Sequence, residues 1–99
     1  MNNTNNWDNQ NTKELLEAIL TLKNTSEAKK FFRDLLTKTE LIEFGNRWKA
    51  VKMLVDGETY IKIEKETGLS STTVARISKW LKHGMGGYKI MTERMNKKR

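Results

Sequence analysis

The 99-residue chain contains no cysteine, no proline and only one histidine, and each shortage excludes a class of chemistry or structure. Without cysteine the chain can form neither a disulfide bond nor a thiolate site, and His83 alone cannot supply a multi-ligand zinc site. We therefore expect no metal and no other cofactor. Because proline and glycine mark most turns and strand ends, the lack of proline and the low count of six glycines favour an all-α fold.

The sequence also lacks a hydrophobic run that approaches the ~18 residues of a membrane span, and its start has no basic export segment. We expect no membrane association and a cytoplasmic location. Residues 1–11 include six asparagines and too little apolar surface to offset the entropy of ordering, so they are predicted to form a disordered tail. Residues 12–96 are predicted to form one domain, followed by a basic tail over residues 97–99.

Negative charge is scarce in the last third of the chain, where the net charge of +7 arises. Residues 71–99 contain eight basic residues and one acidic residue, Glu93. Residues 1–70 contain eleven basic and eleven acidic residues. A surface of one sign attracts polyanions through long-range steering and counterion release. This distribution indicates a nucleic acid as the partner.

Apolar residues recur at helical spacing in the segment that follows the tail, and they predict two short helices. The first is expected over residues 13–23, with Thr12 as its N-cap. The second is expected to begin at Thr25 and to carry an apolar stripe that includes Phe31 and Phe32.

The third predicted helix is the longest, because apolar residues recur from Leu41 onward at alternating spacings of three and four. Thr37 and Glu40 form a capping box at its start, and Gly57 lies just past its end. Beyond it the pattern predicts two short capped helices, a glycine-rich break at residues 83–87 and a last helix. The predicted fold is therefore all-α, with about six short helices.

The segment over about residues 59–82 has the pattern of a helix-turn-helix. Gly68 lies at the turn, where a positive φ is often needed, and Ser70 is placed to cap the second helix. Glu64 departs from the common pattern, because a small residue usually lies where the two helices cross. The apolar residues spaced to pack the two helices together are Ile63, Leu69, Val74 and Ile77.

A helix-turn-helix places its second helix in the major groove of DNA, with the N-terminal half near the bases. The residues expected to face the bases are Ser71, Thr72, Ala75 and Arg76. Small hydroxyl groups allow close approach, and an arginine can pair with guanine. The residues expected to face the phosphates are Lys62, Lys65, Ser70, Thr73, Lys79 and Lys82.

Two other interpretations of these residues stay open. The chain could be a basic helical protein that binds RNA or lacks sequence preference, or it could be a dimerisation module that acts on proteins. An enzyme has almost no support, because the paired carboxylates have lysines nearby and the glycine-rich break lacks the residues of a phosphate-binding loop. Trp48 and Trp80 fall on apolar stripes, which favours a place in the core over stacking on bases.

Three stretches of sequence resemble the Trp-repressor superfamily, in particular its YerC/YecD branch: GNRWKAVKMLVDGE, SSTTVARISKWLK and GMGGYK. The resemblance covers about residues 15–95 and is most specific in the second half. It implies an all-helical transcription regulator that binds double-stranded DNA as a homodimer, intertwined through its N-terminal helices. The residues favour a dimer independently, since the first three helices present more apolar surface than they can cover themselves. The residues expected in the dimer core are Leu15, Ile19, Phe31, Phe32, Leu35, Phe44, Trp48 and Val51.

The resemblance also implies where a tryptophan corepressor would bind. In the repressor the ligand lies between two arginines, and the matching positions here are Arg47 and Arg76. The repressor has glycine directly after the second arginine and serine four residues after it, and here those positions hold Ile77 and Trp80. Both side chains would occupy the volume of the indole, because close-packed interiors do not readily make room. We therefore expect a plugged pocket and DNA binding without tryptophan as corepressor.

Overall fold

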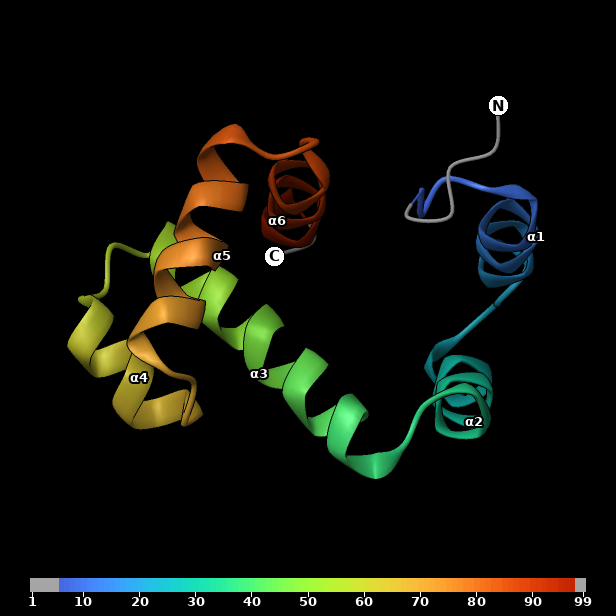
Figure 1. Cartoon of the computed structure of the whole chain (residues 1–99), viewed down its shortest axis with the longest axis horizontal. Coiled ribbons are helices and arrows are strands. Elements are labelled where there is room, and N and C mark those ends of the chain that lie inside the picture. The colour runs from blue at the N-terminus through green and yellow to red at the C-terminus, as the bar shows by residue number, and fades with distance from the viewer. Residues whose placement is uncertain (1–5, 98–99) are drawn as a thin grey trace. The chain divides into compact units, whose positions relative to one another are not determined.

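The computed structural model describes residues 6–97, which form six helices and no strand (Figure 1). The helices are α1 (Gln10–Ile19), α2 (Thr25–Leu35), α3 (Lys38–Val55), α4 (Tyr60–Thr67), α5 (Ser71–His83) and α6 (Gly87–Lys97). The predicted all-α class and the number of helices are confirmed. In the part of the chain that the structure describes, no helix has the length and hydrophobicity to cross a membrane. The chain divides into two compact units, with the boundary between residues 38 and 39.

α1 begins three residues earlier than predicted. Its cap is Asn9, whose side chain accepts a hydrogen bond of 2.9 Å from the amide of Thr12. Thr12 therefore lies in the first turn and is not the N-cap. The tail predicted for residues 1–11 does not extend to Gln10 and Asn11, which are helical, and its first five residues lie outside the described residues.

The connection between α1 and α2 also differs slightly from the prediction. Beyond Ile19 the backbone tightens, because the amides of Thr21 and Leu22 bond to carbonyls three residues back instead of four. This ends α1 before the predicted position. α2 begins at Thr25 as predicted, with Asn24 as its cap.

α1 and α2 bury none of their residues, although both helices are amphipathic. Phe31 and Phe32 meet edge to face, with ring centroids 5.6 Å apart, and each is half-buried. Leu16 and Leu35 are exposed. Short helices gain most of their stability from packing an apolar face, so this unit carries an apolar face that it does not cover by itself.

The second unit has a small core to which α3, α4 and α5 contribute. The apolar side chains with no exposed surface are Ala50, Val51, Ile63, Val74 and Ile77. α5 packs against α4 on one side and α6 on another. The predicted packing of the helix-turn-helix is confirmed, with Leu69 partly buried against the same core.

α3 and α4 each end at a glycine with positive φ, 82° at Gly57 and 76° at Gly68. After α3 the amide of Gly57 donates to the carbonyl of Leu54 at 3.1 Å, and the amide of Glu58 donates to the carbonyl of Met53 at 3.0 Å. This pair of bonds is the Schellman motif, which favours glycine at the left-handed position. The expected role of Gly68 at the helix-turn-helix corner is confirmed.

Candidate nucleic-acid interface

α4 and α5 form the predicted helix-turn-helix, and three residues, Gly68 to Ser70, join them. Ser70 caps α5, because its Oγ accepts a hydrogen bond of 3.1 Å from the amide of Thr73. At the end of α4 the Thr67 hydroxyl donates to a carbonyl one turn earlier at 2.6 Å and accepts from the amide of Leu69 at 3.2 Å. Hydrogen bonds at both ends therefore fix the turn and the direction in which α5 leaves it.

The side chains expected to face the bases are all exposed on α5. They are Ser71, Thr72, Ala75 and Arg76. The opposite face of the helix is buried through Val74, Ile77 and Ser78. α5 thus presents small and hydroxyl-bearing side chains and one arginine to solvent, while its apolar face fixes it to the core.

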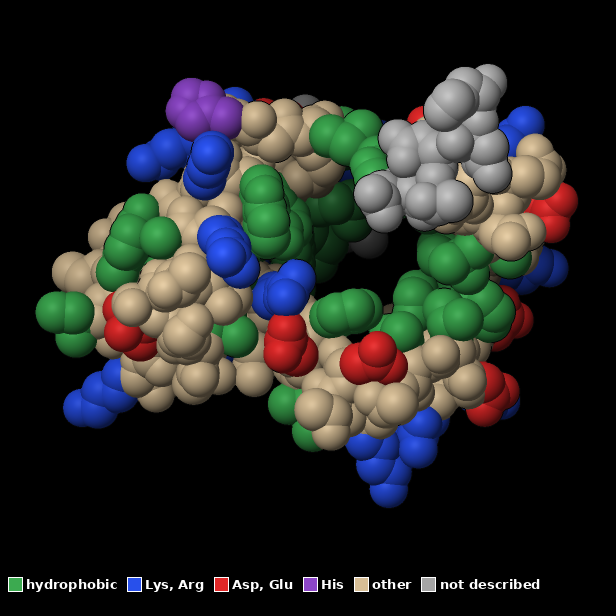
Figure 2. Space-filling view, in the orientation of Figure 1, with side chains coloured by type: hydrophobic (Ala, Val, Ile, Leu, Met, Phe, Trp, Pro, Cys, Tyr) green, Lys and Arg blue, Asp and Glu red, His purple; other side chains and the backbone are tan. Residues whose placement is uncertain are grey.

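Positive charge continues along α5, which contains no Asp or Glu. Lys79 and Lys82 are exposed, and within residues 6–97 neither they nor Arg76 form an ion pair. Figure 2 shows basic side chains in blue over this part of the surface, and the histidine in purple where the helix ends. This face of α5 therefore has cations available for an anionic partner.

Ser70 and Thr73, which were expected to face phosphates, use their hydroxyl groups in the cap of α5. The Ser70 hydroxyl donates to the Thr73 hydroxyl at 3.0 Å. This bond does not use the hydroxyl proton of Thr73, which can still be donated to another acceptor. The Thr73 side chain is half-buried, whereas Ser70 is exposed. Their observed role is to shape the start of the helix.

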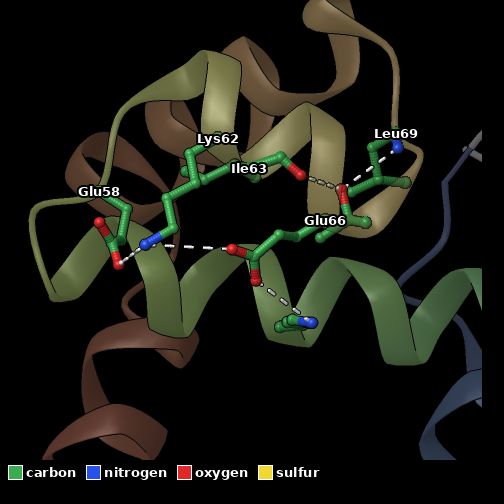
Figure 3. Close-up of polar contacts among 7 residues, drawn as sticks. Glu58, Lys62, Ile63, Glu66 and Leu69 are labelled. Atoms are coloured by element: carbon green, nitrogen blue, oxygen red, sulfur yellow. Dashed lines mark hydrogen bonds and ion pairs between the residues drawn. The ribbon is translucent and has the colours of Figure 1, made fainter.

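The two lysines of α4 differ in their surroundings. Nζ of Lys62 donates a hydrogen bond of 2.9 Å to the Glu58 carboxylate and lies 4.0 Å from that of Glu66 (Figure 3). The other carboxylate oxygen of Glu66 lies 3.6 Å from Nζ of Lys49 on α3. Lys65 is exposed and has no ion pair in the described part of the chain.

The hydrogen bond and the charge of Glu58 raise the pKa of Lys62 above its usual value of 10.5, and Glu66 adds a smaller increase. Loss of hydration acts in the opposite direction but is outweighed. Because the pKa of Lys62 is raised in the folded state, its ion pairs stabilise the fold. This contribution is fully present below pH 10.5 and is lost as the pH rises through the pKa that Lys62 has in the folded chain. At neutral pH Lys62 is therefore charged and already paired.

An apolar groove with a volume of about 620 Å³ opens along α3, α5 and α6. Its lining consists of Trp48, Trp80, Gly84, Met85, Gly87, Tyr88 and Met91. Trp80 is 44 % exposed, so the prediction that it belongs to the core was wrong for the single chain. Trp48 is half-buried and packs against the core as predicted. The sequence pattern did not reveal the groove, because its lining comes from three helices and a glycine-rich loop.

The residues of the expected plugged pocket have different surroundings. Ile77 is fully buried in the core, whereas Trp80 lines the groove and Arg76 is exposed. Arg47 is half-buried and pairs with Glu43 at 2.7 Å, and its Nε has no hydrogen-bond partner among the described residues. Ile77 and Trp80 therefore occupy two separate environments.

The residues expected in the dimer core also divide into two groups. Val51 has no exposed surface and belongs to the core of the chain itself, so it is not available to a second copy. Phe44 is 49 % exposed and Leu35 is 45 % exposed. The others are half-buried: Leu15, Ile19, Phe31, Phe32 and Trp48. All but Val51 therefore leave apolar surface open in the single chain.

Comparison with known proteins identifies the family. The family model of the Trp repressor protein matches residues 10–96. YerC of Bacillus subtilis (strain 168), an uncharacterised protein, is 38 % identical over 82 residues, which cover 83 % of this chain and 79 % of YerC. The crystal structure of a TrpR-like protein from Eubacterium eligens ATCC 27750 has a TM-score of 0.85 and 36 % identity, with 91 % of this chain and 93 % of that chain covered.

A candidate Trp repressor from Staphylococcus aureus is also similar, with a TM-score of 0.83 and 39 % identity over 89 % of this chain and 88 % of that one. These structures share both the fold and a third or more of the sequence, and the family match includes α3 to α5 in full. The resemblance of the three sequence stretches is confirmed. The chain is a member of the Trp repressor family and belongs to its YerC branch.

Proposed function

We propose that the chain is a homodimeric transcription regulator that binds specific sequences in double-stranded DNA and acts in the cytoplasm. The observation that carries this proposal is the exposed face of α5. It combines small side chains with one arginine and two lysines that form no ion pair within residues 6–97, on a helix without acidic residues. At ~1.5 Å per residue, the thirteen residues of α5 extend ~20 Å, enough to lie in a major groove.

Double-stranded DNA fits this face better than RNA. The major groove of A-form RNA is too deep and narrow for side chains to read, whereas that of B-DNA admits a helix. The exposed hydroxyls of Ser71 and Thr72 and the guanidinium of Arg76 are suited to base edges in such a groove. We therefore assign base contacts to these residues and to Ala75, and phosphate contacts to Lys79 and Lys82.

The proposed homodimer accounts for the apolar surface that the single chain leaves open. α1 and α2 bury no residue, and the groove beside Trp80 is lined almost entirely by apolar side chains. Large exposed apolar patches mark interaction surfaces, and most soluble oligomers are two-fold dimers. A two-fold dimer would place its recognition helices ~34 Å apart, which predicts palindromic DNA sites. Sedimentation at micromolar concentration should show a dimer, and a folded monomer would refute this part of the proposal.

We also propose that tryptophan is not a corepressor. Ile77 is fully buried, so the interior volume that a glycine at this position would leave open is already filled. Isothermal titration with free tryptophan should give no binding heat at micromolar concentration. A tenfold rise in DNA affinity on addition of tryptophan would show that a binding pocket survives.

The central experiment measures binding of the full chain to duplex DNA, single-stranded DNA and RNA at several salt concentrations. We expect preference for duplex DNA, and a palindromic site after selection from random duplexes. Lys79→Gln and Lys82→Gln should weaken binding to all sequences and reduce the salt slope by about 0.9 per subunit, whereas Ser71→Ala and Thr72→Ala should change the preference among sites. Equal behaviour of the two groups would refute the assignment. Lys52→Gln, which removes the same charge from α3, is the matched control.

A further inference from the structure

The two helices of the helix-turn-helix differ sharply in charge. α4 contains two lysines and two glutamates, whereas α5 contains three Lys or Arg and no acidic residue. In this motif the first helix crosses the DNA backbone, so the charges of α4 would lie near phosphates. The state of each α4 lysine therefore decides how much that helix contributes to binding.

Ion pairs hold one α4 lysine, whereas the described residues form none with the other. Lys62 lies between Glu58, at 2.9 Å, and Glu66, at 4.0 Å, and Glu66 also approaches Lys49 of α3 at 3.6 Å (Figure 3). These four residues form what we call the α3–α4 charge network. Lys65, one turn along α4, has no such pair among the described residues.

The magnitudes indicate that Lys62 stays in this network when DNA binds. One lysine–phosphate contact contributes about eightfold to affinity at 0.1 M salt, from a slope of ~0.9 per contact. Each exposed ion pair shifts the equilibrium between the paired and the released lysine by up to about fivefold. Lys62 has two carboxylate partners. Releasing Lys62 would give up both pairs and would leave the Glu58 carboxylate unpaired beside a polyanion, while Glu66 would keep Lys49 alone. At the upper end of this range the two pairs together contribute about 25-fold, which exceeds the roughly eightfold gain from a single phosphate contact.

We propose that Glu58 and Glu66 are positioning residues that withhold Lys49 and Lys62 from DNA phosphates, so that Lys65 supplies the phosphate contact of α4. The inference rests on the proposed DNA-binding function and revises the expectation that Lys62 faces a phosphate. Because phosphate contacts carry no sequence information, the network sets affinity for all sequences alike and leaves the preferred site unchanged.

The first test compares Lys62→Gln with Lys65→Gln in the full chain, on a selected duplex and on a random duplex. Both variants remove one positive charge from the same helix. Lys65→Gln should reduce the salt slope by about 0.9 per subunit and the affinity at 0.1 M salt about eightfold per subunit, and Lys62→Gln should produce less than a third of that change in slope. Equal changes in slope would overturn the proposal.

The second test removes the carboxylates. The double variant Glu58→Gln/Glu66→Gln frees both lysines, while Glu64→Gln/Glu93→Gln removes the same charge from two residues without ion pairs in the described part of the chain. The network variant should bind random duplex more tightly, and its salt slope should be steeper by up to about 1.8 per subunit. The control variant should change the salt slope by less than half of that amount. Thermal unfolding checks that both variants fold.

The outcomes separate the two proposals. A wild-type chain that binds no duplex DNA would overturn the proposed function and this inference together. A wild-type chain that binds DNA, with equal slopes for the two double variants, would overturn this inference alone, because net charge would then account for the effect. If the network variant failed to fold, the comparison of Lys62→Gln with Lys65→Gln would still decide the question.

Discussion

Replacing Tyr60 by phenylalanine should destabilise the fold more than replacing Ser78 by alanine, although both changes remove the same hydrogen bond. The Tyr60 hydroxyl of α4 donates to the Ser78 hydroxyl of α5 at 2.7 Å, and this bond joins the two helices of the helix-turn-helix. Its two ends differ in exposure, because Ser78 is 4 % exposed and Tyr60 is 42 % exposed. The cost of each change therefore depends on which group is left without a partner.

The expected magnitudes follow from that difference. Tyr60→Phe leaves the buried Ser78 hydroxyl without a partner and without water, which should lower the free energy of unfolding by about 1–3 kcal/mol. Ser78→Ala removes the buried hydroxyl itself, while the Tyr60 hydroxyl can bond to solvent and alanine favours the helix, so the loss should be about 0–1 kcal/mol. The double variant should match Ser78→Ala within about 0.5 kcal/mol.

Urea unfolding at one fixed protein concentration measures these differences, since the stability of a dimer depends on concentration. Tyr88→Phe is the matched control, because Tyr88 has no side-chain hydrogen bond in the described part of the chain, and it should change stability by less than about 0.5 kcal/mol. Equal losses for Tyr60→Phe and Ser78→Ala, with an additive double variant, would refute the reasoning that burial decides the cost.

Three further predictions concern backbone and core positions, each measured by the same urea unfolding. Gly68→Ala should cost about 1–2 kcal/mol because φ is 76° there, whereas Gly45→Ala in α3, where a Cβ meets nothing within 4 Å, should stabilise by about 0.5–1 kcal/mol. Gly84→Ala should cost about 1–3 kcal/mol, since its Cβ would collide with a backbone carbonyl of α5. Ile77→Ala should cost about 2–5 kcal/mol and Ile61→Ala less than about 1 kcal/mol, because Ile77 is fully buried and Ile61 is 79 % exposed.

The helix-turn-helix could be predicted in detail because its determinants are local. Gly68 is needed for a left-handed turn, Ser70 for a cap, and the apolar spacing on either side for the contact between the helices. Each signal lies within about a dozen residues of the others, and all of them favour the same geometry. The structure therefore reproduces the turn, the cap and the packing contact of this segment.

The start of α1 could not be predicted as well, because two capping residues compete there. Asn9 and Thr12 both have side chains suited to an N-cap, and their capping energies differ by only a few tenths of a kcal/mol. In the structure Asn9 is the cap and Thr12 donates its amide to it. When the local energies are this close, the contacts of the whole helix decide where it begins.

The α3–α4 charge network was only partly visible in the sequence. Glu58, Lys62 and Glu66 follow each other at intervals of four, which is the spacing of ion pairs on a helix face. This signal alone could have shown that Lys62 is paired. The contact of Glu66 with Lys49 joins two helices, and no spacing along the chain predicts it.

Trp80 shows where helical periodicity reaches its limit. The apolar arc of α5 includes both Ile77 and Trp80, and such an arc predicts burial without naming the partner that covers each part. In the single chain the core covers Ile77 completely, while Trp80 lines a groove whose other side is formed by α3 and α6. An arc wider than the core that covers it leaves apolar surface open, and in the proposed dimer a second copy of the chain would cover that surface without any small molecule. The same tryptophan that the sequence placed in a plugged ligand pocket is thus accounted for by the proposed dimer.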